Sequence, residues 1–363
     1  MLARCWLHIG VEKTGTTSIQ RFLAANRKAL RTAGRLYPLV PGPVSHPDLV
    51  CFGLDDARSD RTRKQQGLTE PAQVPGFRTN FQRALNEEIA ASRAEEIIFS
   101  NELLSTRLRS PAELARIKSL CAAIACRTKV VVYLRNQVDF LVSRYTTVIQ
   151  HGGKDEFRVR GTAFVNYARL LDRWATAFGR ENLIVRRFEP ADFAAGDLIA
   201  DFSAVIGLDH SRLVRVPRYN ESLDAESLAF FRALNSRLPS PVSERITPLR
   251  MAAVNILQRR RGGTRFVIPP RQAGRIEDHF RASNEKVSAD YFGSRHQPLF
   301  SPPALVGHAD EIPPRSIGFG TALRITGVLI AGLVSNMLMA VFSRRSTGNR
   351  FWRVNGSRDV WTD

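Results

Sequence analysis

LHIGVEKTGTTSIQ, residues Leu7–Gln20, is the stretch that decides the fold of this 363-residue chain. A short apolar strand runs into a loop bracketed by Gly10 and Gly15, and an amphipathic helix follows. Glycines allow a tight curl whose backbone N–H groups point inward, and the helix N-terminus adds positive potential. Lys13 supplies a positive charge, and the threonines after Gly15 supply hydroxyl donors. The stretch therefore predicts a site for an anion with several oxygens.

The loop differs from the Walker A pattern, G-x-x-x-x-G-K-[ST], in which lysine follows the second glycine. Here Lys13 precedes Gly15, and two threonines follow that glycine. A strand-to-helix turn without a ligand is the plainer interpretation. The combination of one lysine with three threonines favours the anion site.

The pattern along the chain predicts an α/β fold with a P-loop-like parallel sheet flanked by helices. Short apolar runs between polar residues predict strands at Trp6–Ile9, Glu96–Ser100, Lys129–Leu134 and Leu183–Arg187. Helical stripes lie between them, one formed by Ile19, Phe22, Leu23, Asn26 and Leu30 and another by Val138, Leu141, Val142, Tyr145 and Ile149. Strands that alternate with helices indicate a parallel, doubly wound sheet.

The charge of the chain favours anionic partners. Lys+Arg number 53 against 34 Asp+Glu, a formal net charge of +19. The arginines are scattered without the interleaved aromatic residues of a single-strand binding surface, so we expect no nucleic-acid partner. The four cysteines (Cys5, Cys51, Cys121 and Cys126) form no C-x-x-C pair or cluster with His, which indicates reduced core thiols in a cytosolic protein. The N-terminal apolar run is too short for a signal peptide.

The segment K-T-G-T-T-S, residues 13–18, resembles the 5′-phosphosulfate loop of sulfotransferases, especially bacterial enzymes related to those that modify polysaccharides and capsules. The resemblance covers roughly residues 4–293. It implies that the co-substrate is 3′-phosphoadenosine 5′-phosphosulfate and that no metal takes part. The loop residues that it assigns to the co-substrate are Gly10, Lys13, Thr14, Gly15, Thr16 and Thr17.

A second motif expected from this resemblance is a strand that ends in Arg, with Ser eight residues later, to bind the 3′-phosphate. Residues 130–145 contain it, with Arg135 at the end of the strand and Ser143 two turns into the next helix. An arginine at a strand end can offer a two-pronged hydrogen bond to phosphate. A P-loop kinase or NTPase normally ends a strand with Asp to hold Mg²⁺, and an arginine there would repel a metal.

Glu102 is the candidate general base, the residue that takes the proton of the acceptor hydroxyl. It follows the strand Glu96–Ser100, at the carboxyl edge of a parallel sheet, where ligands bind. The resemblance implies a base in this segment, His in cytosolic sulfotransferases and Glu in several carbohydrate sulfotransferases. His151 and His46 are alternative bases, and Glu102 could instead be a cap or an ion-pair partner. His8 lies in the first strand and is expected to be a packed core residue.

Weaker resemblances occur near the C-terminus, at 218–223, 234–235, 280–286 and 291–293, and none has an assigned chemistry. Residues 41–80 lack apolar periodicity, which predicts a long surface excursion that could cover a site. The predicted domains are a sulfotransferase domain over 1–296, a Pro-rich linker over 297–316, a hydrophobic helix over 317–345 and a basic tail over 346–363.

Residues 325–342 contain no charge, which makes them a candidate membrane anchor. Ser335 and Asn336 at their centre weaken this interpretation, and a buried or dimer-forming helix is the alternative. We therefore expect a cytoplasmic protein with a candidate attachment to the inner face of the membrane. The basic tail after the segment runs against the positive-inside trend for that orientation.

The expected function is transfer of a sulfuryl group from 3′-phosphoadenosine 5′-phosphosulfate to an acceptor hydroxyl, with a carbohydrate as the expected acceptor and a lipid or small metabolite as alternatives. A P-loop nucleotide-dependent kinase and a non-catalytic, membrane-attached nucleotide-binding protein are the alternative functions.

Overall fold

The chain forms two compact units. The computed structural model describes residues 1–157, 165–216, 223–237, 247–258, 264–294, 297–306 and 318–346, without the side chains of 247–249 and 334–346. Unit 1 comprises Met1–Tyr145, Phe157–Asn220 and Val267–Ile312, and unit 2 comprises Thr146–Glu156, Glu221–Phe266 and Pro313–Asp363. The boundaries predicted at 296, 316 and 345 remain predictions.

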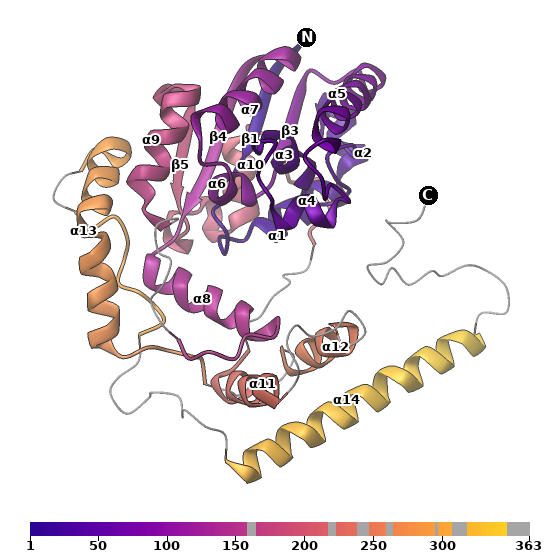
Figure 1. The fold of residues 1–363 in the computed structure, drawn as a ribbon, viewed down its shortest axis with the longest axis vertical. Helices are drawn as coiled ribbons and strands as arrows, with labels where there is room; N and C mark the ends of the chain where they lie inside the picture. Colours follow the sequence, from indigo (N-terminus) through magenta and orange to yellow (C-terminus); the bar gives the residue numbers. More distant parts are fainter. Residues whose placement is uncertain are drawn as a thin grey trace. The chain divides into compact units, whose positions relative to one another are not determined.

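Unit 1 contains a five-stranded sheet of order β2-β3-β1-β4-β5 in which every pair is parallel (Figure 1). The strands are β1 (Leu2–His8), β2 (Arg35–Leu36), β3 (Glu96–Ser100), β4 (Ala125–Leu134) and β5 (Leu183–Arg187). The α/β prediction with a parallel sheet is therefore confirmed. All four predicted strands exist, and the two-residue β2 was not predicted.

Helices cover both faces of this sheet, as a doubly wound sheet requires. α7 packs against β1 and β4, α9 packs against β4 and β5, and α1 contacts α10. The helices whose residues lie wholly or largely in unit 1 are α1 (Thr16–Ala25), α2 (Arg27–Thr32), α3 (Pro47–Gly53), α4 (Arg61–Gln65), α5 (Gln73–Ser92), α6 (Leu103–Arg107), α7 (Pro111–Ile124), α8 (Gln137–Gln150), α9 (Tyr167–Phe178), α10 (Leu198–Val205) and α13 (Pro270–Phe292), with short 3-10 turns η2 (Arg180–Asn182), η3 (Pro190–Asp192) and η4 (Ala194–Gly196).

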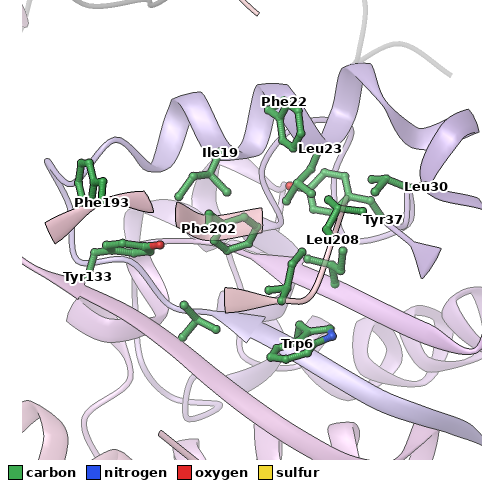
Figure 2. Packing of buried hydrophobic residues seen from close by; sticks show 13 residues of the cluster. Trp6, Ile19, Phe22, Leu23, Leu30, Tyr37, Tyr133, Phe193, Phe202 and Leu208 are labelled. Carbon is green, nitrogen blue, oxygen red and sulfur yellow. The ribbon is translucent and has the colours of Figure 1, made fainter. Parts of the chain in front are cut away.

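The core between α1, α10 and the sheet fixes the helix that follows the glycine loop. Ile19, Phe22 and Leu23 of α1 are buried against Trp6 of β1 and Phe202 of α10. Figure 2 shows these side chains gathered between α1 and the strands. Burial of each such side chain contributes about 1.5–3 kcal/mol. The apolar stripe predicted for this helix is thus confirmed as its core-facing side.

The predicted surface excursion over residues 41–80 is wrong in part. Residues 47–53 form α3, and Leu49, Val50, Cys51 and Phe52 of this helix are buried. α3 packs against α7, whose start is held by a capping box between Ser110 and Glu113. Seven residues are too few for a helical period to stand out in the sequence, and the helix begins at Pro47, a residue that is well tolerated at a first helical position.

The cysteines are unpaired by disulfides. Cys5, Cys51 and Cys121 are buried, as predicted, while Cys126 is exposed on β4. Cys5 and Cys121 lie face to face, with their Sγ atoms 3.8 Å apart.

Unit 2 contains α11 (Ala225–Arg237), α12 (Thr247–Gln258) and α14 (Phe319–Ser346), and α14 contacts both of the others. Arg324 of α14 pairs with Glu226 of α11 at 2.9 Å. The uncharged segment 325–342 lies in the helical backbone of α14, and the side chains of its second half lie outside the described residues. In the described part of the chain, no helix combines the length and the apolar character needed to cross a membrane. The proposed membrane contact is therefore untested.

Several segments singled out in the sequence lie outside the described residues: 218–222, the basic stretch 259–263, part of the predicted linker (307–316) and the tail from 347. Asn235, from one of the weaker resemblances, is buried in unit 2 and donates hydrogen bonds to the Ile149 and Gly153 carbonyl oxygens.

Two buried histidines stabilise the part of the sheet next to the glycine loop. His8 contacts the Ser100 hydroxyl at 2.8 Å and packs against Tyr133 and Phe202, so its predicted core position is confirmed. His46 accepts a hydrogen bond from the Ser100 backbone N–H at Nδ1, and its Nε2 lies 3.2 Å from the Pro38 carbonyl oxygen. Burial lowers the pKa of each imidazole to about 3.

These two residues predict an acid-sensitive fold. Because the folded pKa is lowered, only the unfolded chain takes up the protons near pH 6.5. The two histidines should lower the free energy of unfolding as the pH drops from 6.5 towards 3, by up to about 1.4 kcal/mol per pH unit for each histidine. The carboxyl of Asp48, whose pKa burial raises to about 7, should act in the opposite direction. Urea unfolding between pH 5 and 7.5 measures the net slope. His46→Asn should change that slope by roughly the contribution of one histidine, and His151→Gln, at an exposed position, should leave it unchanged. If the slope of unfolding free energy against pH is the same in His46→Asn as in the unmodified protein, the lowered pKa of His46 is contradicted.

Candidate active site

The loop after β1 is built on the sheet itself. The Val11 N–H donates to the Tyr133 carbonyl oxygen at 3.2 Å, and the Tyr133 N–H donates to the Gly10 carbonyl oxygen at 3.2 Å. The backbone then curls through positive φ angles at Gly10 (80°), Lys13 (65°) and Gly15 (73°). Lysine rarely adopts such an angle, at a cost of about 1–2 kcal/mol. Strained backbone of this kind is typical of functional sites.

The threonines of the loop have different environments. The Thr14 hydroxyl donates to the Val11 carbonyl oxygen at 2.6 Å and is fully buried, so it holds the loop closed. Thr16 and Thr17 begin α1, whose N-terminus carries N–H groups without partners inside the helix. Gly15 is the left-handed residue that precedes this helix. Thr14 therefore contributes mainly to loop shape, and the roles of Thr16 and Thr17 as donors to an anion stay predictions.

Close packing explains the glycines that bracket the loop. A Cβ at Gly10 would lie 2.6 Å from Glu102 Cβ and 2.7 Å from Glu102 Cα. A Cβ at Gly15 would lie 2.3 Å from Leu198 Cδ2. The loop therefore packs directly on the residue predicted to be the base, which sequence reasoning did not foresee.

Arg135 bridges the end of β4 and the loop. Its Nη1 donates to the Lys13 carbonyl oxygen at 2.8 Å, and its guanidinium lies 5.6 Å from the centre of the Phe188 ring. Tyr167 donates its hydroxyl to the Arg135 carbonyl oxygen at 2.6 Å. Burial lowers the pKa of Arg135 from its ordinary value. Tyr167 and Phe188 are site residues missed in the sequence, since each contact joins positions more than thirty residues apart.

Ser143 lies two turns into α8, half-buried and within unit 1. The strand-end arginine and the helix serine thus follow β4 in the predicted order.

Glu102 lies between β3 and α6, at the carboxyl edge of the sheet. The Gln20 side chain of α1 donates Nε2–H to Glu102 Oε2 at 2.8 Å. The Ser105 hydroxyl donates to the Glu102 carbonyl oxygen at 2.8 Å, and Asn101 Oδ1 accepts from the Leu103 N–H. Both the backbone and the carboxylate of Glu102 are therefore held in place.

The charges of Lys13 and of the acidic residues around it influence one another. Burial lowers the pKa of Lys13, and the charge of Arg135 lowers it further, while Glu12 and Glu102 oppose the shift. Burial raises the pKa of Glu12, against the effect of Arg144. Lys13 thus lies within electrostatic reach of both glutamates and Arg135. Glu12 was missed in the sequence because it looked like an ordinary loop residue.

The alternative bases lie elsewhere. His46 is fully buried and both of its ring nitrogens have hydrogen-bonding contacts, which leaves no nitrogen directed at a ligand. His151 is exposed in unit 2, with Nδ1 2.8 Å from the Thr147 carbonyl oxygen. Over the described residues, no three His, Cys, Asp or Glu side chains are grouped as metal ligands would be.

No protein-family model matches the chain. An uncharacterized protein of Archaeoglobus fulgidus is 29% identical over 199 residues, which cover 51% of this chain and 52% of that protein. The chain thus spans about half the length of this curated relative. The crystal structure of a sulfotransferase from Alicyclobacillus acidocaldarius aligns with 65% of this chain and 93% of its own, at 18% identity and a TM-score of 0.39. A TM-score this low does not establish a common fold.

The contact between Gly10 and Glu102 leads to a prediction about packing. Gly10→Ala should destabilise the protein by about 2–4 kcal/mol, because the new methyl group meets the Glu102 backbone in addition to the strain of a positive φ. Gly67→Ala is the matched control, since Gly67 has a φ of 72° and nothing within 4 Å of its added Cβ. It should cost only about 1 kcal/mol. Urea unfolding measures both variants. Equal losses of unfolding free energy would show that the packing of Gly10 on Glu102 can relax.

Proposed function

We propose that this chain is a sulfotransferase that moves the sulfuryl group of 3′-phosphoadenosine 5′-phosphosulfate to an acceptor hydroxyl. The observation that carries the proposal is the 2.8 Å hydrogen bond from Arg135 Nη1 to the Lys13 carbonyl oxygen. It joins a cation at the end of β4 to the anion-binding loop after β1. Two basic positions at one edge of the sheet suit a ligand with two separate phosphate groups.

The 5′-phosphosulfate would accept hydrogen bonds from the backbone N–H groups of the loop and the start of α1, and from Thr16 and Thr17. Lys13 would add its charge. Arg135 has five N–H donors, and among the described residues one of them bonds to the Lys13 carbonyl oxygen; further N–H donors would bind a 3′-phosphate. Ser143, eight residues further on, would add a hydroxyl.

In the reaction, the acceptor oxygen attacks sulfur in line with the bond between sulfur and the phosphate oxygen. The new S–O bond forms as that bond breaks, and the leaving group is 3′-phosphoadenosine 5′-phosphate. Glu102 takes the proton of the acceptor hydroxyl. Lys13 and the loop N–H groups stabilise the negative charge that grows on the leaving oxygen.

The alternative of a P-loop kinase is less well supported. Such enzymes hold Mg²⁺ with an acidic residue at a strand end, and the corresponding β4 ends next to Arg135. A non-catalytic binding protein would need no carboxylate beside the loop, and the held carboxylate of Glu102 favours an enzyme.

For the acceptor we propose a carbohydrate, because the net charge of +19 suits a hydroxyl-rich ligand that is itself acidic. A cytoplasmic location, with membrane contact through residues 325–342, belongs to the same proposal.

The nucleotide preference tests the donor. Binding should be much tighter for 3′-phosphoadenosine 5′-phosphate than for adenosine 5′-phosphate, and magnesium with ATP should not compete. Arg135→Ala should remove most of the difference, on the order of 2 kcal/mol, because it deletes a charged donor to the 3′-phosphate. Isothermal titration calorimetry measures all three ligands.

Arg83→Ala is the control for net charge, since Arg83 is exposed on α5 and pairs only with Glu87 among the described residues. It should leave the preference unchanged. Equal affinity of the unmodified protein for the two monophosphate nucleotides would exclude the proposed donor.

Glu102→Gln tests the base. This change preserves size and hydrogen bonding but removes basicity, so turnover should fall by roughly a hundredfold or more while affinity for 3′-phosphoadenosine 5′-phosphate stays near normal. His151→Ala is the matched comparison and should retain turnover. If the histidine variant is inactive and Glu102→Gln is active, His151 is the base.

A further inference from the structure

We infer that Gln20 is a positioning residue that orients the Glu102 carboxylate towards the acceptor. This inference rests on the proposed sulfuryl transfer and adds a residue to it. Gln20 is 3% exposed and lies one turn after Thr16, on the helix whose N-terminus faces the anion site. Its role is set by its partner, which lies 82 residues away in the sequence.

The chemistry of the contact defines its direction. A carboxylate oxygen can only accept, so the Gln20 amide nitrogen must be the donor to Glu102 Oε2, at 2.8 Å. The same nitrogen lies 3.5 Å from the Ser100 carbonyl oxygen, a much weaker contact. The carboxylate is therefore the main partner of this buried amide, and buried amides without a partner are costly.

The geometry limits the freedom of Glu102 from two directions. On one side, the Cα of Gly10 approaches so closely that no Cβ fits there. On the other, Gln20 engages one of the two carboxylate oxygens. The close approach of Gly10 restricts the Cα and Cβ of Glu102, and the hydrogen bond from Gln20 restricts rotation of its carboxylate. Because Gln20 and the N-terminus of α1 belong to one rigid helix, the base and the donor site keep a constant separation.

The test compares Gln20→Met, which retains length but loses the donor, with Asn26→Leu. Asn26 is equally buried at the end of the same helix and bonds to the Phe22 and Val214 carbonyl oxygens instead. Turnover is measured as release of 3′-phosphoadenosine 5′-phosphate from 3′-phosphoadenosine 5′-phosphosulfate with water as the acceptor. Gln20→Met should lose roughly 10- to 100-fold in turnover with its nucleotide affinity unchanged.

Asn26→Leu should retain both turnover and nucleotide affinity. A fall in nucleotide affinity that matches the fall in turnover in Gln20→Met would overturn the inference, because Gln20 would then merely support the loop. So would a turnover of Gln20→Met equal to that of Asn26→Leu.

A double-mutant cycle gives a readout without turnover. Gln20→Met and Glu102→Ala should together cost less unfolding free energy than the sum of the single changes, whereas Asn26→Leu and Glu102→Ala should be additive. Additivity in the first cycle would show that Gln20 and Glu102 do not interact, and would overturn the inference. Coupling in that cycle without any nucleotide binding by the unmodified protein would instead place the failure in the proposed function.

Discussion

The hydrogen bond between Arg135 and the Lys13 carbonyl oxygen is the interaction on which the site depends. Lys13 has a left-handed backbone conformation that is unfavourable for a residue with a side chain. The guanidinium at the end of β4 holds that backbone in place, 122 residues away in the sequence. The parallel pairing of β1 with β4 makes this possible, because it brings the two strand ends to the same edge.

A second constraint connects the loop to the acidic residue. β3 pairs with β1 on the side opposite β4, so Glu102 reaches the loop from the other direction. Gly10 permits contact between the two backbones, and Gln20 adds a polar link from α1. The cation and the carboxylate therefore flank one loop, each held by a neighbouring strand. Such preorganisation is what general-base and electrostatic catalysis require.

Local patterns predicted the scaffold well. The predicted bounds of β3 and β5 agree with the structure, because short apolar runs between polar residues mark buried parallel strands. β1 and β4 extend further towards the N-terminus than predicted, where charged residues such as Arg4 and Arg127 interrupt the apolar run. The two-residue β2 carries too little sequence for any pattern. α3 was missed because its seven residues are buried by α7, a partner distant in the chain.

The sequence predicted only those site residues whose residue type itself indicates a chemical role. A lysine between two glycines, with threonines after the second glycine, indicates an anion site, and an arginine after a strand indicates a second one. The contacts of Gln20, Tyr167 and Phe188 depend on tertiary structure, and no local pattern distinguishes these side chains from ordinary core residues. The sequence likewise does not show that His46, an alternative base, has both ring nitrogens in contact with backbone groups.

A crystal structure of the chain with 3′-phosphoadenosine 5′-phosphate tests the central claim most directly. The 5′-phosphate should bind the backbone N–H groups between Lys13 and Thr17. The 3′-phosphate should lie within hydrogen-bond distance of the Arg135 guanidinium and the Ser143 hydroxyl, with the Lys13 backbone still in its left-handed conformation. A nucleotide bound with its 3′-phosphate in solvent, or bound away from the loop after β1, would contradict it.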